Sequence, residues 1–141
     1  MQKSFIRLVL GLFLLSGIAT ADMVVPANAL PQAAQGFISS TFKDAQVMYV
    51  EQDFDSFEVR LSNGVKVDFY RDGTWKEIES YNGVNPAILP PQVAATLKST
   101  FPNVIIVKAE REWNGYEVKL SNMMQVYLNE AGLIVGQKYD D

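Results

Sequence analysis

A segment of 50 residues occurs twice in this chain, and the repeat constrains the fold more than any other feature of the sequence. Residues 30–79 align with residues 89–138 without a gap, and 13 of the 50 positions are identical. The identical positions include a Leu-Pro pair, a Ser-Thr-Phe triplet, a Val-x-Leu-Ser-Asn segment and one glycine. A repeat of this size indicates one supersecondary motif made twice. The fold should therefore contain two similar units.

The N-terminal 21 residues have the pattern of an export signal. Lys3 and Arg7 supply positive charge, and residues 8–18 are apolar. Residues 19–21, Ala-Thr-Ala, match a cleavage site before Asp22. The apolar run is shorter than the roughly 20 residues that span a bilayer, and without a cysteine the chain is not a lipoprotein. The sequence predicts a periplasmic protein with no membrane insertion after signal cleavage.

Cysteine and histidine are both missing, which excludes much of enzyme chemistry. The chain has no thiol nucleophile, no Ser-His-Asp or Cys-His arrangement, no histidine-ligated zinc and no ordinary general base near neutral pH. We therefore predict that it is not an enzyme and has no catalytic residues, metal ligands or cofactor.

The charge of the chain is acidic. The net charge of −4 becomes −6 when Lys3 and Arg7 are removed with the signal segment. Nucleic acids and anionic membranes attract basic surfaces, so both are poor partners for this chain. An unidentified periplasmic or surface protein is the partner that this balance allows.

Each repeat is predicted to be a helix followed by four strands. Apolar residues recur at helical spacing over about 30–42 and again over about 90–101. Apolar and polar residues then alternate with the period of two that is typical of strands. Asn63-Gly64 predicts a type I′ hairpin turn between two of these strands.

The predicted fold class is α+β. Two tandem α-β-β-β-β units form one antiparallel sheet of about eight strands, with both helices on one face. Residues 80–88 join the units and are too few to separate two domains. We therefore expect residues 22–141 to be a single domain of two repeats, with the second sheet face open.

The repeated motifs resemble those of a known family. A signal segment, a Leu-Pro helix ending in Ser-Thr-Phe, and a strand with aromatic-Glu-Val-basic-Leu-Ser-Asn are similar to the PepSY-like, beta-lactamase-inhibitor-like family of secreted bacterial proteins. The resemblance covers about residues 30–139. It implies tandem α-β units, a periplasmic location and no catalysis. It also implies a partner protein bound on the open sheet face, as inhibitor-like members do.

The open sheet face is the candidate binding site. Mixed charges interleaved with tyrosine are typical of protein-binding surfaces. The alternative is a solvated face with cross-strand ion pairs. The predicted partner-binding residues are Glu58, Arg60, Tyr70, Trp75, Glu117, Lys119 and Tyr127.

The aromatic residues near strand ends have two interpretations. Phe54 and Trp113 occupy equivalent positions in the two repeats, which favours a structural role in closing the core. Trp75 has no aromatic counterpart, because Ile134 takes its place. Trp75 is therefore the stronger candidate for a partner contact.

A divalent cation or a small ligand is the alternative to a protein partner. Glu51, Asp53 and Asp55 lie close together in sequence, but the residues after Asp53 do not match a calcium loop. The second repeat places Glu110 and Glu112 at the corresponding positions, where an irregular carboxylate site remains an open alternative. The protein would then be an envelope sensor or binder of a cation such as calcium.

Overall fold

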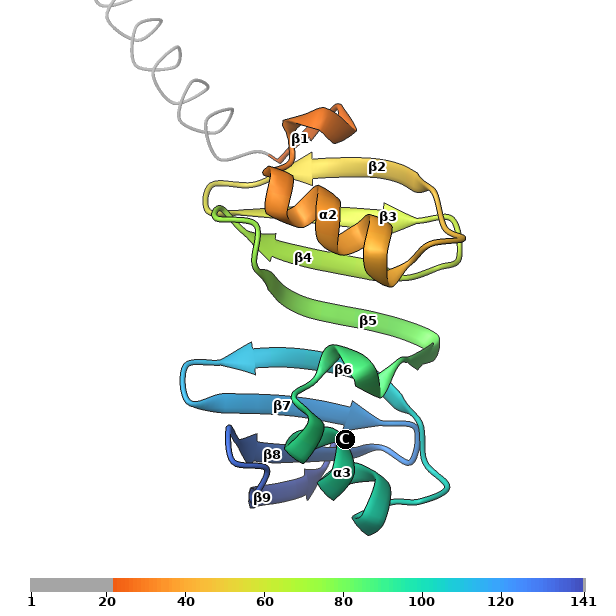
Figure 1. Cartoon of the computed structure of the whole chain (residues 1–141), viewed down its shortest axis with the longest axis vertical. Helices are drawn as coiled ribbons and strands as arrows, with labels where there is room; N and C mark the ends of the chain where they lie inside the picture. Colours follow the sequence, from red (N-terminus) through yellow and green to blue (C-terminus); the bar gives the residue numbers. More distant parts are fainter. Residues whose placement is uncertain (1–21, 141) are drawn as a thin grey trace, which may run out of the picture.

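The computed structural model describes residues 22–140, which form a layer of helices on a single sheet (Figure 1). The predicted signal segment, residues 1–21, lies outside the described residues. The helical elements are η1 (Ala27–Ala29), α2 (Gln32–Thr41), η2 (Pro86–Ile88) and α3 (Pro91–Thr100). The strands are β1 (Met23–Val25), β2 (Val47–Gln52), β3 (Ser56–Leu61), β4 (Lys66–Tyr70), β5 (Trp75–Val84), β6 (Ile106–Glu112), β7 (Gly115–Leu120), β8 (Met124–Asn129) and β9 (Ile134–Tyr139).

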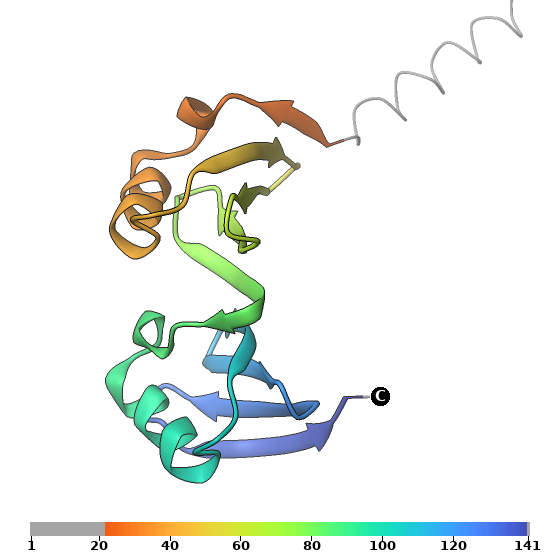
Figure 2. The same cartoon turned by 90° about the vertical axis from the view of Figure 1, so that its right-hand side faces the viewer.

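All nine strands lie in one antiparallel sheet, in the order of the chain. Figure 2 shows α2 and α3 on the same side of this sheet, so the predicted α+β arrangement is confirmed. The strand count is nine instead of about eight because β1 pairs with β2, Met23 opposite Gln52. Residues 23–25 precede the repeat, so comparison of the two copies gave no indication of this strand.

The sheet is continuous through the segment that joins the repeats. The sequence predicted a connection over 80–88, but β5 (Trp75–Val84) extends into it as far as Val84. Glu77 of β5 is the Cα partner of Asp68 in β4 and also of Glu110 in β6. β5 is thus the last strand of one unit and the neighbour of the first strand of the next.

The core lies between the helices and one face of the sheet. Ala34 and Ile38 of α2, like Val93 and Leu97 of α3, are buried, since residues four apart share one face of a helix. They belong to one apolar cluster that includes strand residues of both repeats. Burial of each large apolar side chain contributes about 1.5–3 kcal/mol, so this layer is the main source of stability.

The turn at Asn63-Gly64 differs from the predicted type I′ turn. Only Gly64 has a positive φ, of +87°, whereas type I′ requires one at both central residues. The N–H of Gly64 donates to the carbonyl oxygen of Leu61 at 3.1 Å, as in a type I turn followed by a left-handed residue. The equivalent position in the second repeat is Met123, with a φ of +72°.

Candidate functional site

The side of the sheet opposite α2 and α3, here called the open face, is covered by no element in residues 22–140 (Figure 2). Strand side chains alternate between the two faces, so each strand places every second residue on the open face. In β8, for example, Met124, Val126 and Leu128 are buried while Gln125 and Tyr127 are half-buried. The register of the sheet determines which open-face residues become neighbours.

Six carboxylates form a line across six adjacent strands of the open face. Each member is the Cα partner of the next across the sheet. We call this line the acidic row, and it consists of Glu51, Glu58, Asp68, Glu77, Glu110 and Glu117. Beyond Glu117 the line continues with Tyr127 in β8. The repeat alone does not produce this row, because Tyr127 and Gly136 replace Asp68 and Glu77 in the second copy.

A line of mostly basic residues runs beside the acidic row, separated from it by two residues on each strand. We call it the basic row; its cations are Arg60, Lys66, Lys108, Lys119 and Lys138. Glu79 and Gln125 interrupt this line. The open face is therefore divided into two parallel stripes of opposite charge.

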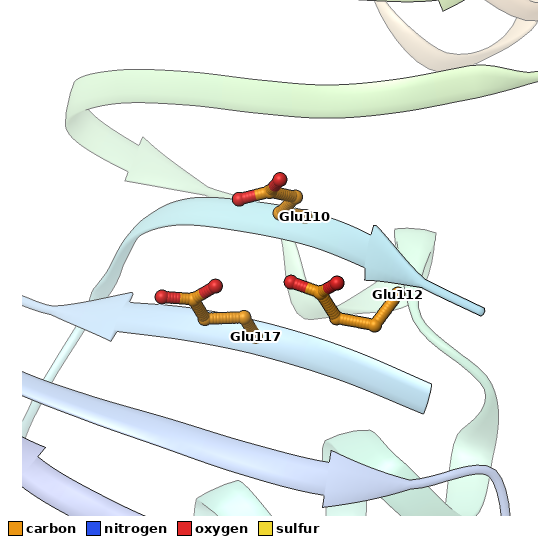
Figure 3. Close-up of side chains that lie close together, drawn as sticks. All are labelled: Glu110, Glu112 and Glu117. Atoms are coloured by element: carbon orange, nitrogen blue, oxygen red, sulfur yellow. The ribbon is translucent and has the colours of Figure 1, made fainter. Parts of the chain in front are cut away.

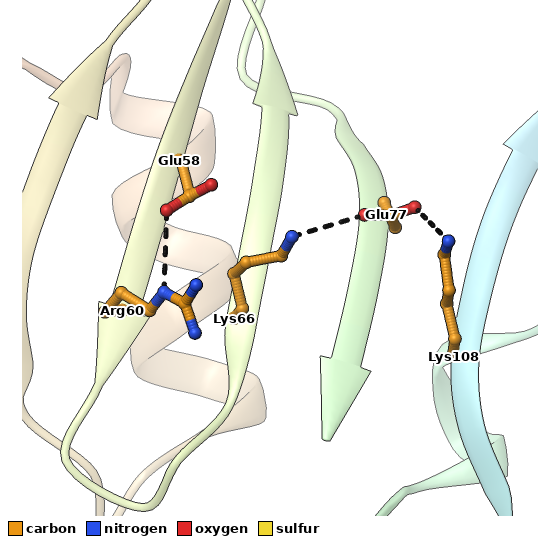
Figure 4. A network of polar contacts seen from close by, with 5 residues as sticks. All are labelled: Glu58, Arg60, Lys66, Glu77 and Lys108. Carbon is orange, nitrogen blue, oxygen red and sulfur yellow. Dashed lines mark ion pairs between the residues drawn. The ribbon is translucent and has the colours of Figure 1, made fainter. Parts of the chain in front are cut away.

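Glu77 connects the two stripes at the centre of the sheet (Figure 4). Its carboxylate lies 3.7 Å from Nζ of Lys66 and 3.0 Å from Nζ of Lys108. These lysines belong to different repeats, so the network joins both halves of the face. A further ion pair, 3.5 Å long, joins Arg60 and Glu58 within β3. Glu58 and Lys66, on adjacent strands, do not pair with each other among the ion pairs of residues 22–140.

Asp68 is the most perturbed carboxyl group of the acidic row. Its Oδ1 is buried and has no hydrogen-bond partner among the described residues. Burial raises the pKa of Asp68 to about 6, and the carboxylates of Glu77 and Glu58 add to this rise while Lys66 opposes it. Burial and the neighbouring carboxylates also raise the pKa of Glu110. Like-charge neighbours within the row therefore make ionisation harder.

Three carboxylates converge where the acidic row crosses β6 and β7. Figure 3 shows the side chains of Glu110, Glu112 and Glu117 pointing toward one another, with oxygens within 4.8 Å of each other. Burial, followed by a hydrogen bond to Glu117, raises the pKa of Glu112. Calcium takes six to eight oxygen ligands, so the three groups supply at most part of a coordination shell. The structure thus brings the predicted Glu110 and Glu112 together with Glu117.

Most of the predicted partner-binding residues lie on the open face. Glu58, Arg60, Tyr70, Glu117, Lys119 and Tyr127 are all half-buried or exposed there. Tyr70 is 39% exposed and has the ammonium group of Lys76 5.8 Å from its ring centre. Their role in binding remains a prediction.

The prediction that Trp75 is a partner-binding residue is wrong, because its side chain is not on the surface. Trp75 is 3% exposed and lies in the core, 6.3 Å from the ring of Tyr116. The reason is a register shift between β4 and β5, which places Trp75 opposite the buried Phe69 instead of on the open face. Trp75 is therefore a core residue and is removed from the candidate surface.

Phe54 and Trp113 are also not where the repeat comparison placed them. They are 88% and 93% exposed, so neither closes the core. Each lies in a hairpin tip, between β2 and β3 or between β6 and β7, beyond the last paired residues of the sheet. Both tips lie at the same end of the sheet, on the left in Figure 1. Both repeats have an aromatic residue at this position, and the structure shows that the shared feature is an exposed aromatic side chain.

Glu77 is the functional candidate that sequence reasoning missed. It lies at the middle of the acidic row and takes part in two ion pairs. The repeat gives no indication of its role, because the equivalent residue is Gly136. Only the register of β5 against both neighbours reveals it.

The fold and the site define a class of α+β proteins in which one antiparallel sheet carries helices on one side and a free, charged surface on the other. Within this class, the chain belongs to the beta-lactamase-inhibitor-like, PepSY-like family, whose profile matches residues 18–66 and 55–135. Among residues 22–140, no helix has the length and apolar character that crossing a membrane requires.

Solved structures with the same fold come from Bacteroides species. A protein of Bacteroides thetaiotaomicron described as calcium-regulated and periplasmic is 30% identical, with a TM-score of 0.78, over 83% of this chain and 96% of its own. A periplasmic protein of unknown function from Bacteroides vulgatus is 29% identical, with a TM-score of 0.77, over 84% of this chain and 99% of its own. No curated protein matches the chain.

Proposed function

We propose that the chain is a non-enzymatic periplasmic binding module that docks a protein partner on its open face. The observation that carries this proposal is the open face itself, a continuous nine-stranded surface with ordered charges and no covering element in residues 22–140. The periplasmic location is supported by the related structures. Inhibition of an enzyme is the form of docking that the family description favours.

The size of the face supports a protein as the occupant. Adjacent strands are about 4.8 Å apart and each residue adds about 3.3 Å, so the face measures about 38 Å by 20 Å. The resulting area, roughly 800 Å², is what one partner contributes to a standard protein–protein interface. Tyr70 and Tyr127 supply contact area with a polar tip at the two halves of this face.

Affinity capture from the envelope with matched variants tests the proposal. The open-face variant is Tyr70→Ala/Tyr127→Ala. The control is Tyr139→Ala, because Tyr139 pairs with the buried Met124 and so lies on the helix side. We expect a specific partner to be captured by the wild type and the control and lost with the double variant. Retention of that partner by the double variant at unchanged affinity would show that the open face is not its docking site.

A divalent cation is the second candidate ligand, favoured by the convergence of Glu110, Glu112 and Glu117 (Figure 3). Thermal unfolding with and without calcium tests it. Binding should raise Tm by several degrees, since a ligand that binds only the folded state stabilises it. Glu117→Gln should abolish the increase and Glu79→Gln, outside the cluster, should retain it. An unchanged Tm for the wild type excludes this candidate.

A further inference from the structure

The charges of the open face are not balanced within the molecule. Four cations of the basic row already form ion pairs, with Glu58, Glu77 and Asp140. In the acidic row, only Glu58 and Glu77 do so among residues 22–140. The unpaired members of the acidic row are Glu51, Asp68, Glu110 and Glu117. The charge that the open face leaves for a partner is therefore negative and arranged in a line.

This arrangement is unfavourable for the isolated protein. Like charges directly opposite each other in a sheet are destabilising, and the acidic row places a carboxylate opposite a carboxylate at five successive strand pairs. A sheet that needed only solubility would alternate its charges between strands. The buried Oδ1 of Asp68, which has no hydrogen-bond donor among the described residues, lies within the same row. A row of cations brought by a partner would relieve the repulsion between these carboxylates.

The exposed aromatic tips, at one end of the sheet, are a second and independent feature that is typical of contact with a protein. Phe54 and Trp113 are large apolar side chains left almost fully in water at equivalent positions of the two repeats. The two hairpins are four strand spacings apart, about 19 Å. Along β2 and β3, the acidic row lies between this end of the sheet and the basic row. Tryptophan and phenylalanine in such places are typical anchors of protein interfaces.

We propose that the partner of the open face is a protein that presents lysine and arginine side chains in a line, flanked by an apolar patch that receives Phe54 and Trp113. The proposal rests on the proposed function and specifies the chemistry of its partner. Cations on an α-helix at every third or fourth residue recur about every 5.4 Å, close to the 4.8 Å between carboxylates of the acidic row. Charge complementarity of this kind increases association rate and specificity.

A binding assay with a defined probe tests this inference. The probe is a fluorescein-labelled helical peptide of about 20 residues with lysine at every third or fourth position and one tryptophan near its end. The row variant is Glu110→Gln/Glu117→Gln. The control is Asp44→Asn/Glu130→Gln, which removes the same charge from exposed loops outside the open face. We expect the row variant to weaken binding at least 10-fold and the control to change it less than 2-fold.

Each other outcome overturns the proposal. Equal weakening in both variants would mean that the peptide responds to net charge alone. No binding to the wild type would mean that a line of cations is not recognised. A salt-sensitive dimer in sedimentation experiments would assign the face to a second copy. Capture from the envelope distinguishes failure of this inference from failure of the proposed function. A partner that is lost with Tyr70→Ala/Tyr127→Ala but retained with Glu110→Gln/Glu117→Gln would disprove the basic partner. The open face would still be the docking site.

Discussion

The guanidinium group of Arg111 lies 4.4 Å from the ring centre of Trp75, so a cation of the second repeat stacks on an aromatic ring of the first. Both side chains are on the helix side of the sheet, where Trp75 also contacts Tyr116. The Nε of Arg111 is buried and has no hydrogen-bond partner among the described residues. The stacked pair is thus a direct link between the two halves of the core.

The two tryptophans should report opposite environments. Trp113→Phe leaves only the buried Trp75, whose fluorescence should be blue-shifted and poorly quenched by acrylamide. Trp75→Phe leaves only the exposed Trp113, which should be red-shifted and readily quenched. Partner binding should protect Trp113 and leave Trp75 unchanged. Similar quenching of both single-tryptophan variants would contradict the structure.

Met123→Gly should stabilise the protein by about 0.5–1 kcal/mol. A left-handed backbone costs a non-glycine residue about 1–2 kcal/mol, and part of the gain is lost because glycine is more flexible in the unfolded chain. Urea unfolding measures the difference. Gly64→Ala, at the equivalent position in the first repeat, should instead destabilise by about 1 kcal/mol. A destabilising Met123→Gly would show that the Met123 side chain matters more than its backbone.

Stability should fall as the pH rises from about 4 to 6, through the ionisation of Asp68. Because the pKa of Asp68 is raised to about 6 in the folded state, the folded protein binds its proton more tightly than the unfolded chain, whose pKa is 3.8. Asp68→Asn should reduce this decrease, leaving the part that the raised pKa values of Glu110 and Glu112 contribute, and should stabilise the protein at pH 7 by about 1–2 kcal/mol, after allowance for solvent screening.

The control for this pH effect is Asp72→Asn. The backbone N–H of Thr74 donates to Asp72 Oδ1 at 2.9 Å and lowers the pKa of that carboxyl. Its stabilising contribution is present above the unfolded pKa and is lost as the pH falls. Asp72→Asn should therefore leave the decrease between pH 4 and 6 in place. An undiminished decrease in Asp68→Asn would rule out Asp68 as its source.

Glu77→Gln should destabilise the protein by about 1–2 kcal/mol, more than Glu58→Gln. Glu77 is half-buried and pairs with two lysines. Glu58 pairs only with Arg60 among residues 22–140, and the side chain of Arg60 is more exposed than those of the two lysines. Removing Glu77 leaves both lysines without their charge partner, while exposed pairs contribute at most about 1 kcal/mol. Chemical denaturation of both variants measures the difference, and equal effects would mean that the network adds nothing beyond a surface pair.

The architecture could be predicted from sequence because its signals are local. Helical spacing, period-two alternation and turn residues are properties of short segments, and the repeat doubled each of them. β1 and the extension of β5 to Val84 were missed because neither has a counterpart in the repeated pattern.

The site could be predicted only in part because it depends on register. Glu58 and Glu117 were identified from alternation, but their alignment with Glu77 follows from pairings between strands. The bulge that moved Trp75 into the core belongs to the same class of information. Alternation gives the face of a residue within a strand, whereas hydrogen-bonded neighbours give its place in a row.

The pairing of β5 on both sides has a mechanical consequence. Because β5 hydrogen-bonds to both β4 and β6, the two halves share this strand. The acidic row and the basic row should therefore form one continuous surface across both repeats. A partner is expected to contact both halves together. Removal of residues 85–140 would take away β6 and leave one edge of β5 without a hydrogen-bonded neighbour. We therefore expect that the two repeats cannot be separated into two independently folded parts.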